Sequence, residues 1–265
     1  MSTPVELTVH SSPAPAPSRR VIAVASGKGG VGKTWFSITV AHALARAGQR
    51  TLLFDGDLGL ANVDIQLGLT PARDLGAVLA GQATLGQVAA PFADGGFDII
   101  AGRSGSGGLA NLPQQRLSAL GEELATLARR YDRTIIDLGA GVERPVRYLA
   151  SIAGTTVVVT TDEPTALTDA YAFIKVTAQE TPGVNLGVVV NMAATRRDGE
   201  RTYGTLLKAC KGFLKIEPPL LGIVRRDPKV REAIRHQTPL LTRYPNTEAA
   251  QDVEAVAKRL IDEAS

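Results

Sequence analysis

A glycine-rich segment near the start of the chain has the residue types and the spacing that bind a polyphosphate. Residues 27–34 read GKGGVGKT and fit the pattern G-x-x-x-x-G-K-[ST], between an apolar run and a helical pattern. Glycines let the backbone curl so that several N–H groups point at the phosphates. Lys33 can then reach the β- and γ-phosphates, and the Thr34 hydroxyl can ligate Mg²⁺. A glycine-rich turn that binds nothing is a much weaker interpretation.

The predicted nucleotide contacts extend along the whole loop and one residue beyond it. They are Gly27, Lys28, Gly29, Gly30, Val31, Gly32, Lys33, Thr34 and Trp35. Trp35 is the only tryptophan of the chain. The sequence leaves open whether its ring packs in the core or lies near the nucleotide.

Three aspartates end apolar runs further along the chain. Asp55 and Asp57 close the run TLLFDGD, and Asp137 closes TIID. A carboxylate at the carboxyl end of a strand, beside a phosphate loop, can help to hold Mg²⁺ or orient a water molecule. Taken alone, such an aspartate more often caps a turn. Their order after the phosphate loop is what favours a metal-binding and catalytic role.

The elements that must position these side chains alternate along the chain. Apolar runs that indicate buried strands cover 21–25, 51–55, 97–101, 133–138, 155–161, 186–191 and 220–224. Helical patterns cover 34–47, 75–79, 85–89, 113–130, 165–179, 203–211, 229–235 and 246–263. Strands that are apolar along their whole length are buried on both faces. We therefore predict an α/β chain with the three-layer P-loop NTPase fold, a mostly parallel central sheet flanked by helices.

The composition fits one domain that follows a short tail. The chain has 265 residues, of which 44% are hydrophobic, and it can bury a substantial core. Residues 1–19 contain the run SSPAPAPS and are predicted to form a disordered tail rich in Pro, Ala and Ser, with the domain at 20–265. The absence of a signal-peptide pattern or a long apolar stretch favours a cytoplasmic protein.

The second lysine of the loop, Lys28, is not needed by an ordinary phosphate loop. With it, GKGGVGKT resembles the deviant Walker A motif of the MinD/ParA ATPases, and the likeness covers nearly all of 21–261. The resemblance implies an ATP hydrolase that uses ATP and Mg²⁺. It implies that Lys28 reaches across a dimer interface to the partner's nucleotide, so that ATP joins two subunits and hydrolysis separates them.

The same resemblance assigns roles to single residues. Lys28, Lys33 and Asp57 serve catalysis, with Asp57 positioning the attacking water. Thr34, Asp55 and Asp137 hold Mg²⁺, Asp55 through water, and the Gly139-Ala140-Gly141 run matches switch II. Asn191, Arg225 and Asp227 are the expected adenine contacts. The family commonly has proline where Arg225 stands, and without the resemblance Asn191 is equally suited to cap a turn.

Several longer segments resemble the FlhG/FleN regulators of flagellar number. They are residues 57–71, 104–112, 162–175 and 189–193. The resemblance implies a dimerising switch with slow ATP hydrolysis that sets flagellar number or placement, in the cytoplasm or peripherally at the inner membrane or cell pole. Expected partners are the GTPase FlhF, a flagellar switch or C-ring component, or a transcription regulator. Residues 1–20 lack the D-Q-A-like element with which FlhG proteins activate FlhF.

Membranes and DNA are weaker candidates for a partner. The helix predicted at 246–263 carries five acidic and two basic residues, and its apolar stripe is better suited to packing on the fold than to lipid. Basic clusters at 196–201, 208–215 and 225–235 leave a partition-type ATPase with nonspecific DNA binding as the alternative function. Such clusters are more often solvated faces.

Three further alternatives are less well supported. Cys210 is the only cysteine, which discounts an iron–sulfur protein of this superfamily, because a cluster shared by a dimer needs two thiolates from each chain. No tyrosine follows Tyr244, which discounts a tyrosine autokinase. A scaffold that binds nucleotide without turnover is the plainest alternative.

Overall fold

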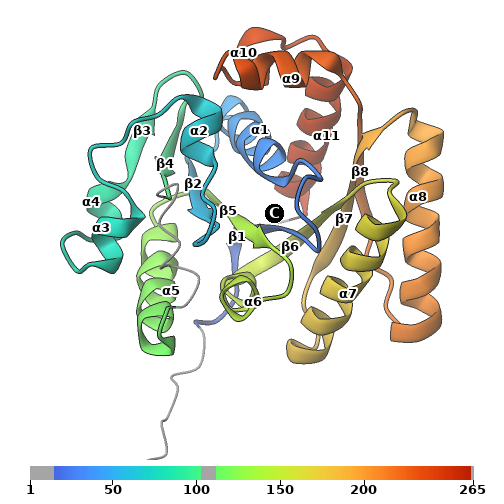
Figure 1. Cartoon of the computed structure of the whole chain (residues 1–265), viewed down its shortest axis with the longest axis horizontal. Helices are drawn as coiled ribbons and strands as arrows, with labels where there is room; N and C mark the ends of the chain where they lie inside the picture. The colour runs from blue at the N-terminus through green and yellow to red at the C-terminus, as the bar shows by residue number, and fades with distance from the viewer. Residues whose placement is uncertain (1–14, 103–111, 264–265) are drawn as a thin grey trace, which may run out of the picture.

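An eight-stranded sheet runs through the molecule in the order β3-β4-β2-β5-β1-β6-β7-β8 (Figure 1). The structure is a computed structural model that describes residues 15–102 and 112–263. Every neighbouring pair of strands is parallel except β3 with β4. The predicted α/β fold with a mostly parallel sheet is therefore confirmed. The strands are β1 (Ser18–Ser26), β2 (Thr51–Gly56), β3 (Ala90–Phe92), β4 (Phe97–Ile100), β5 (Arg133–Ala140), β6 (Ala153–Thr160), β7 (Leu186–Ala193) and β8 (Leu220–Arg225).

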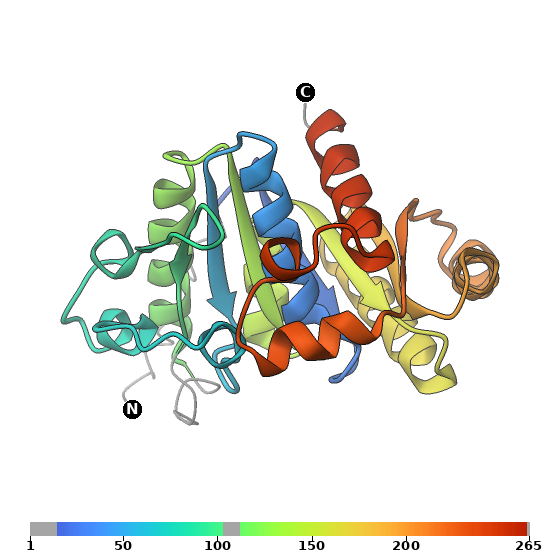
Figure 2. The ribbon, with the colours of Figure 1, turned by 90° about the horizontal axis from the view of Figure 1, so that it is seen from above.

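Helices cover both faces of the sheet and make the outer two layers (Figure 2). One face is covered by α1 (Lys33–Arg46), α9 (Pro228–Arg235), α10 (Leu240–Arg243) and α11 (Glu248–Asp262). The other is covered by α5 (Gln114–Ala128), α6 (Arg144–Ser151), α7 (Pro164–Glu180) and α8 (Arg196–Ala209), which ends in a π-helical turn (Cys210–Leu214). Three short helices follow β2 and precede β3 in the sequence, namely α2 (Val63–Leu67), α3 (Leu75–Leu79) and α4 (Leu85–Val88).

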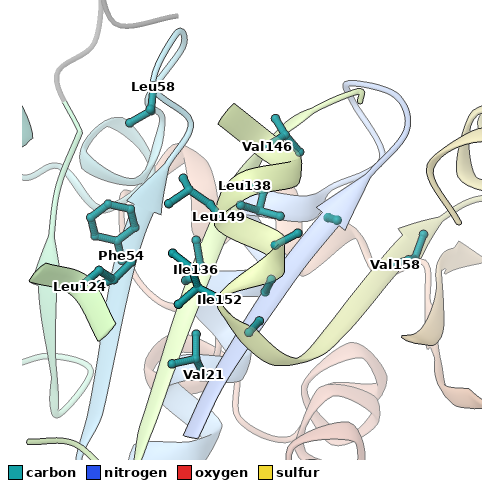
Figure 3. Close-up of a cluster of buried hydrophobic side chains, with 14 of the residues drawn as sticks. Val21, Phe54, Leu58, Leu124, Ile136, Leu138, Val146, Leu149, Ile152 and Val158 are labelled. Carbon is teal, nitrogen blue, oxygen red and sulfur yellow. The ribbon is translucent and has the colours of Figure 1, made fainter. Parts of the chain in front are cut away.

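The apolar side chains of the strands form one core on each face. On the face of α5 and α6, Phe54, Leu124, Ile136 and Leu149 are completely buried (Figure 3). Burying a side chain of this size stabilises the fold by about 1.5–3 kcal/mol relative to leaving it exposed. The central strands β2, β5 and β1 are thus clamped between two cores, which holds the loops at their carboxyl ends in fixed positions.

Five elements differ from the sequence prediction. Strand β3 was not expected, because it is very short and contains Pro91, which only an edge position tolerates. Helix α8 begins at Arg196 instead of residue 203, since the Thr195 side chain accepts the Asp198 N–H as a cap. The apolar pattern hid this start because the first turns are charged. Helices α2, α6 and α10 were missed because each is short and presents few buried residues.

The predicted tail boundary is two residues late. Strand β1 begins at Ser18, whose N–H donates to the Ile152 carbonyl at 3.1 Å and which pairs with Ala153. Residues 1–14 of the predicted tail lie outside the described residues, and so does almost all of the family-like segment 104–112. Within the described part of the chain, no helix has the length and apolar character needed to cross a bilayer.

Candidate nucleotide site

The phosphate loop joins β1 to α1 at the carboxyl edge of the sheet. Gly30 and Gly32 have φ angles of 84° and 83°, a left-handed conformation that is costly for residues with a side chain. A Cβ at Gly27 would lie 2.1 Å from the Asp169 backbone, and one at Gly32 would lie 2.5 Å from Asn191 Nδ2. The glycines of the motif are therefore needed for the turn and for the close approach of α7 and β7.

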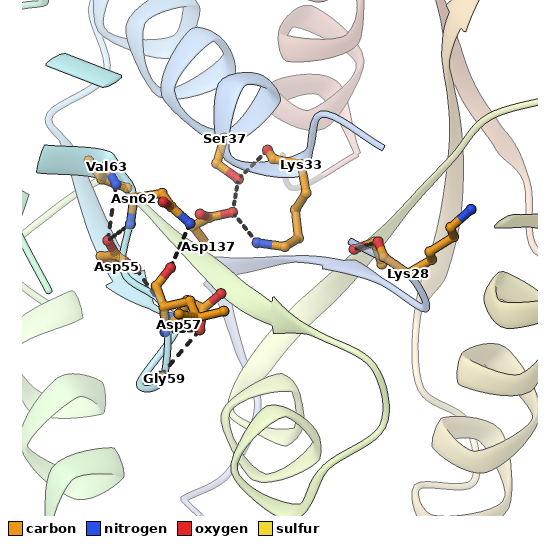
Figure 4. A network of polar contacts seen from close by, with 11 residues as sticks. Lys28, Lys33, Ser37, Asp55, Asp57, Gly59, Asn62, Val63 and Asp137 are labelled. Atoms are coloured by element: carbon orange, nitrogen blue, oxygen red, sulfur yellow. Dashed lines mark hydrogen bonds and ion pairs between the residues drawn. The ribbon is translucent and has the colours of Figure 1, made fainter. Parts of the chain in front are cut away.

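Lys33 and Asp137 form a buried ion pair at the inner side of this loop. Lys33 Nζ lies 2.9 Å from Asp137 Oδ1, and the two side chains are 8% and 1% exposed (Figure 4). Ser37, one helical turn after Lys33, donates its hydroxyl to the same Oδ1 at 2.8 Å. The sequence prediction missed Ser37, although the i+4 spacing from Lys33 places both on the same face of α1.

Asp55 lies beside this pair and is completely buried. Its carboxylate accepts backbone N–H groups from Asp57, Asn62 and Val63, each at 3.2 Å. Burial, and then the charge of Asp137, raise the pKa of Asp55 to about 7. Two carboxyl groups held together in this way favour a cation between or beside them.

The oxygen donors at this edge fit a Mg²⁺ ion that is bound together with a nucleotide. The buried Asp137 Oδ2 has no hydrogen-bond partner among the described residues. No group of three or more His, Cys, Asp and Glu side chains in the described ranges could hold a metal alone. This agrees with an ion whose shell is completed by Thr34, phosphate oxygens and water. The metal-binding roles of Thr34, Asp55 and Asp137 stay predictions.

Asp57 lies in the loop after β2, near the end of β5. Its Oδ1 accepts the N–H groups of Gly59 at 3.3 Å and Leu60 at 2.9 Å. A Cβ built on Gly139 would lie 3.4 Å from this oxygen, so the first residue of the predicted switch II is close to Asp57. The carboxylate is thus held in place by the backbone of its own loop, and its water-positioning role stays a prediction.

Lys28 points away from Lys33 and from its own phosphate loop (Figure 4). Its Nζ donates to Glu163 Oε2 at 2.7 Å and to Thr165 Oγ1 at 2.8 Å, at the start of α7. The hydrogen bond and charge of Lys28 lower the pKa of Glu163. The pair is open to solvent, with the Lys28 side chain 37% exposed. The ammonium group is therefore presented outward, held by an ion pair that water screens.

The predicted adenine side meets the loop at a small cavity. Asn191 Nδ2 donates to the Val31 carbonyl at 2.8 Å, so this asparagine braces the phosphate loop. A cavity of about 150 Å³ beside the loop is lined by Lys28, Gly29, Gly30, Val31, Thr161, Asp162, Glu163, Met192 and Arg226. Met192 and Arg226 were missed, although each directly follows a residue that was predicted.

Two predicted contacts lie elsewhere. The Trp35 side chain is buried in the core shared with α11, which settles the alternative left open by the sequence in favour of packing. The Arg225 guanidinium is not brought to the loop, because Asp252 and Glu248 of α11 bind it. Asp227 caps α9 by accepting the Lys229 N–H at 2.8 Å. Its contact with adenine stays a prediction.

The sequence matches a known family and two flagellar proteins. Residues 22–240 match the model of the CobQ/CobB/MinD/ParA nucleotide binding domain. The chain is 35% identical to the antiactivator FleN of Pseudomonas aeruginosa, over 91% of this chain and 86% of FleN. It is 30% identical to the flagellum site-determining protein YlxH of Helicobacter pylori, over 91% of this chain and 82% of YlxH.

The fold matches that of septum-site proteins with solved structures. The MinD protein of Pyrococcus horikoshii, solved with Mg-ADP, superposes with a TM-score of 0.79 at 25% identity and covers 93% of this chain and 97% of its own. The MinC:MinD complex of Aquifex aeolicus superposes with a TM-score of 0.75 at 26% identity, over 92% and 96% of the two chains. The chain therefore belongs to the MinD/ParA family of P-loop ATPases, which use ATP and Mg²⁺, and within it to the branch of FleN and YlxH.

Proposed function

We propose that this ATPase is a dimerising switch whose ATP-bound form controls the number or placement of flagella. The observation that carries the proposal is the outward position of Lys28. In this position the ammonium group is held by Glu163 and turned away from Lys33. It is available to a second copy whose nucleotide site faces it.

The proposed cycle begins when ATP enters the site and its phosphates compete for Lys33. Lys33 then exchanges Asp137 for the β- and γ-phosphates, and Asp137 becomes free to face the cation. Mg²⁺ neutralises the phosphate charge when it is bound. Lys28 leaves Glu163 and completes the site of the facing subunit.

Hydrolysis depends on positioning in this proposal. Asp57, held at the rim by the backbone of Gly59 and Leu60, orients a water molecule in line with the γ-phosphorus. Because Asp57 lies close to Gly139 of the predicted switch II, loss of the γ-phosphate changes the surroundings of both segments. Turnover is slow, since the useful product is the change from dimer to monomer.

The names of the two most informative relatives support the flagellar role. FleN is an antiactivator and YlxH determines a flagellum site. For this chain we propose a cytoplasmic protein that acts at the inner membrane or cell pole. Its partner is the GTPase FlhF, a flagellar switch or C-ring component, or a transcription regulator, recruited by the ATP-bound dimer.

Neither a lipid-binding α11 nor DNA is favoured as the means of localisation. The stripe of α11 formed by Ala249, Val253, Val256 and Leu260 is buried against the fold, as predicted. Five of the eleven basic residues in the three clusters are paired with acids, which lowers the charge available to the partition-type alternative only in part. The pairs are Arg196–Asp252, Arg201–Asp198, Lys211–Glu217, Arg225–Asp252, Arg225–Glu248 and Lys229–Glu232.

Mass photometry with ATP, ADP or no nucleotide tests the switch. The wild-type chain should dimerise with ATP and Mg²⁺ only. Lys28→Ala should bind ATP and stay monomeric, whereas Asp57→Ala should bind ATP and accumulate as dimers because hydrolysis is blocked. Lys258→Ala, an exposed lysine of α11, is the matched control and should behave as the wild type.

A Lys28→Ala variant that still dimerises with ATP contradicts the role of Lys28. Wild-type hydrolysis no faster than that of Asp57→Ala favours the scaffold alternative. Mass spectrometry of the proteins that co-purify with Asp57→Ala, but not with Lys28→Ala, then identifies the partner. Recovery of no flagellar component in that comparison counts against the flagellar assignment.

A further inference from the structure

The edge of the sheet opposite the phosphate loop carries a cavity with a strong positive charge. This cavity has a volume of about 250 Å³ and is lined by Arg19, Arg20, Gln49, Asp132 and Arg133. Its residues lie at the start of β1 and β5 and just before β2. At about 3.3 Å per residue, the nine residues of β1 separate it from the phosphate loop by about 25 Å.

The arginines of this cavity outnumber the acids that could neutralise them. Asp132 is its only carboxylate, and one of its oxygens already accepts the Arg50 N–H at 2.9 Å. The other lies 4.0 Å from the Arg20 guanidinium, which instead donates to the Tyr131 carbonyl at 3.0 Å. The Arg50 guanidinium stacks on the Tyr131 ring nearby and adds to the positive charge.

Arg133 is partly buried, whereas Arg19 and Arg20 are exposed. Its Nε is buried and has no hydrogen-bond partner among the described residues. Its remaining hydrogen bonds go to the backbone carbonyls of Asp132 and Ile261. Burial lowers the pKa of Arg133, and the positive charge of Arg20 lowers it further while Asp132 opposes them. Arg133 therefore has a buried Nε without a partner beside Asp132, a carboxylate that also lies near Arg20.

A second cavity continues from the first and offers a different set of contacts. It measures about 240 Å³, shares Arg19, and is also lined by Ile22, Gly154, Thr155, Asn185, Leu260 and Glu263. Apolar and uncharged polar groups dominate this part. The two cavities together can hold a molecule with an anionic end and a larger, mostly neutral remainder.

We propose that this arginine-lined cavity binds a phosphate group of a small phosphorylated molecule, at a site separate from the ATP site. A guanidinium group matches a phosphate because its planar N–H donors bind two oxygens at once. An anion between Arg19, Arg20 and Arg133 would supply the missing counter-charge and a partner for the buried Nε. The concave shape favours a free ligand over the flat surface of a membrane.

Isothermal titration calorimetry with inorganic pyrophosphate tests the site. The full chain is first saturated with Mg-ADP, so that the phosphate loop is closed to the probe. One pyrophosphate should then bind per chain. The double variant Arg19→Ala, Arg20→Ala should weaken this binding by at least about tenfold, because it removes two charge-assisted contacts. The control Arg197→Ala, Arg231→Ala removes two exposed arginines elsewhere and should leave it unchanged.

Two further measurements keep the test decisive. The double variant Arg19→Lys, Arg20→Lys keeps the positive charges but loses the planar N–H donors that bind two oxygens at once. Pyrophosphate binding should therefore recover only in part. Mg-ADP affinity should be equal in all variants, which separates this site from the ATP switch. Equal weakening by the control pair would indicate a diffuse charge effect and overturn the proposal. So would binding to vesicles of phosphatidylglycerol without any binding of pyrophosphate, which would assign the arginines to a lipid surface.

Discussion

The two lysines of the phosphate loop are both paired with a carboxylate, but in opposite surroundings. Lys33 lies in the interior, within 2.9 Å of an aspartate that is 1% exposed. Lys28 lies at the surface, within 2.7 Å of a glutamate that is 62% exposed. A buried pair is costly to break from one side only, whereas an exposed pair exchanges readily with water.

This difference separates two tasks within one short motif. The inner pair holds the site together when no nucleotide is present, and only a strong competitor such as a triphosphate can displace Asp137 from Lys33. The outer pair keeps Lys28 ordered but easily released. The Lys33–Asp137 pair is therefore suited to responding to nucleotide. The Lys28–Glu163 pair is suited to responding to a second copy of the protein.

The largest effect is expected from breaking the inner pair. Lys33→Ala leaves the buried Asp137 without its counter-charge and should lower the free energy of unfolding by about 3 kcal/mol. It should also abolish measurable ATP binding. Urea denaturation and calorimetry measure both effects. Lys28→Ala is the comparison and should leave the urea midpoint unchanged; equal losses in the two variants would contradict the distinction drawn here.

The next effect concerns pH. Because the pKa of Asp55 is raised from 3.8 to about 7, the folded chain keeps a proton that the unfolded chain loses near pH 4. This contribution to stability is complete below about pH 4 and is lost as the pH rises through 7, by at most about 1.4 kcal/mol per unit. Urea titrations of the nucleotide-free chain between about pH 5 and 7 should show the decline.

Asp55→Asn is the control for that measurement. The variant should remove this part of the slope while other titrating groups are unchanged. Mg²⁺ with ADP should also flatten it, since a cation favours the ionised carboxylate. A slope that is the same in the variant would show that another group is responsible.

A smaller effect is expected from the hydroxyl that supports the inner pair. Ser37→Ala removes a buried donor to Asp137 and should cost about 1 kcal/mol of stability. Thr39→Val is matched to it, because Thr39 lies on the same helix and bonds only to the Trp35 carbonyl. The serine variant should be the less stable of the two and should bind Mg-ATP more weakly. If Thr39→Val were the less stable of the two variants in urea, the proposed role of Ser37 in the site would be contradicted.

The smallest effect concerns the outer pair. Glu163→Gln weakens the contact that holds Lys28 within its own chain and should raise the dimer fraction roughly two- to threefold at half-saturating ATP. Mass photometry at fixed protein concentration measures this. Glu217→Gln, which loosens the exposed pair with Lys211, should have no effect. Fewer dimers in Glu163→Gln would show that Glu163 serves the dimer itself.

The sequence was sufficient for the fold and for the phosphate loop because both depend on local patterns. Apolar runs predicted seven of the strands, and glycine spacing predicted a loop in which Gly30 and Gly32 adopt positive φ angles. The three aspartates were placed correctly at the carboxyl edge, since sequence order fixes where parallel strands end.

Features that depend on tertiary contact were not predictable in the same way. Trp35 follows the loop in sequence, yet helix geometry turns its ring into the core. The Arg225 guanidinium forms an ion pair with Asp252, which lies 27 residues later in the sequence. The arginines of the amino edge are separated by more than 100 residues, and only the pairing of β1 with β5 brings Arg20 near Arg133.

The short strand β3 has a consequence for how copies of this protein meet. It is one of the two terminal strands of the sheet, runs antiparallel to β4 and contains Pro91, which lacks an N–H group. Such an edge is a poor template for adding another chain's strand. Irreversible association into fibres by strand addition is therefore disfavoured at β3. Reversible association that depends on the nucleotide competes with less aggregation at this edge.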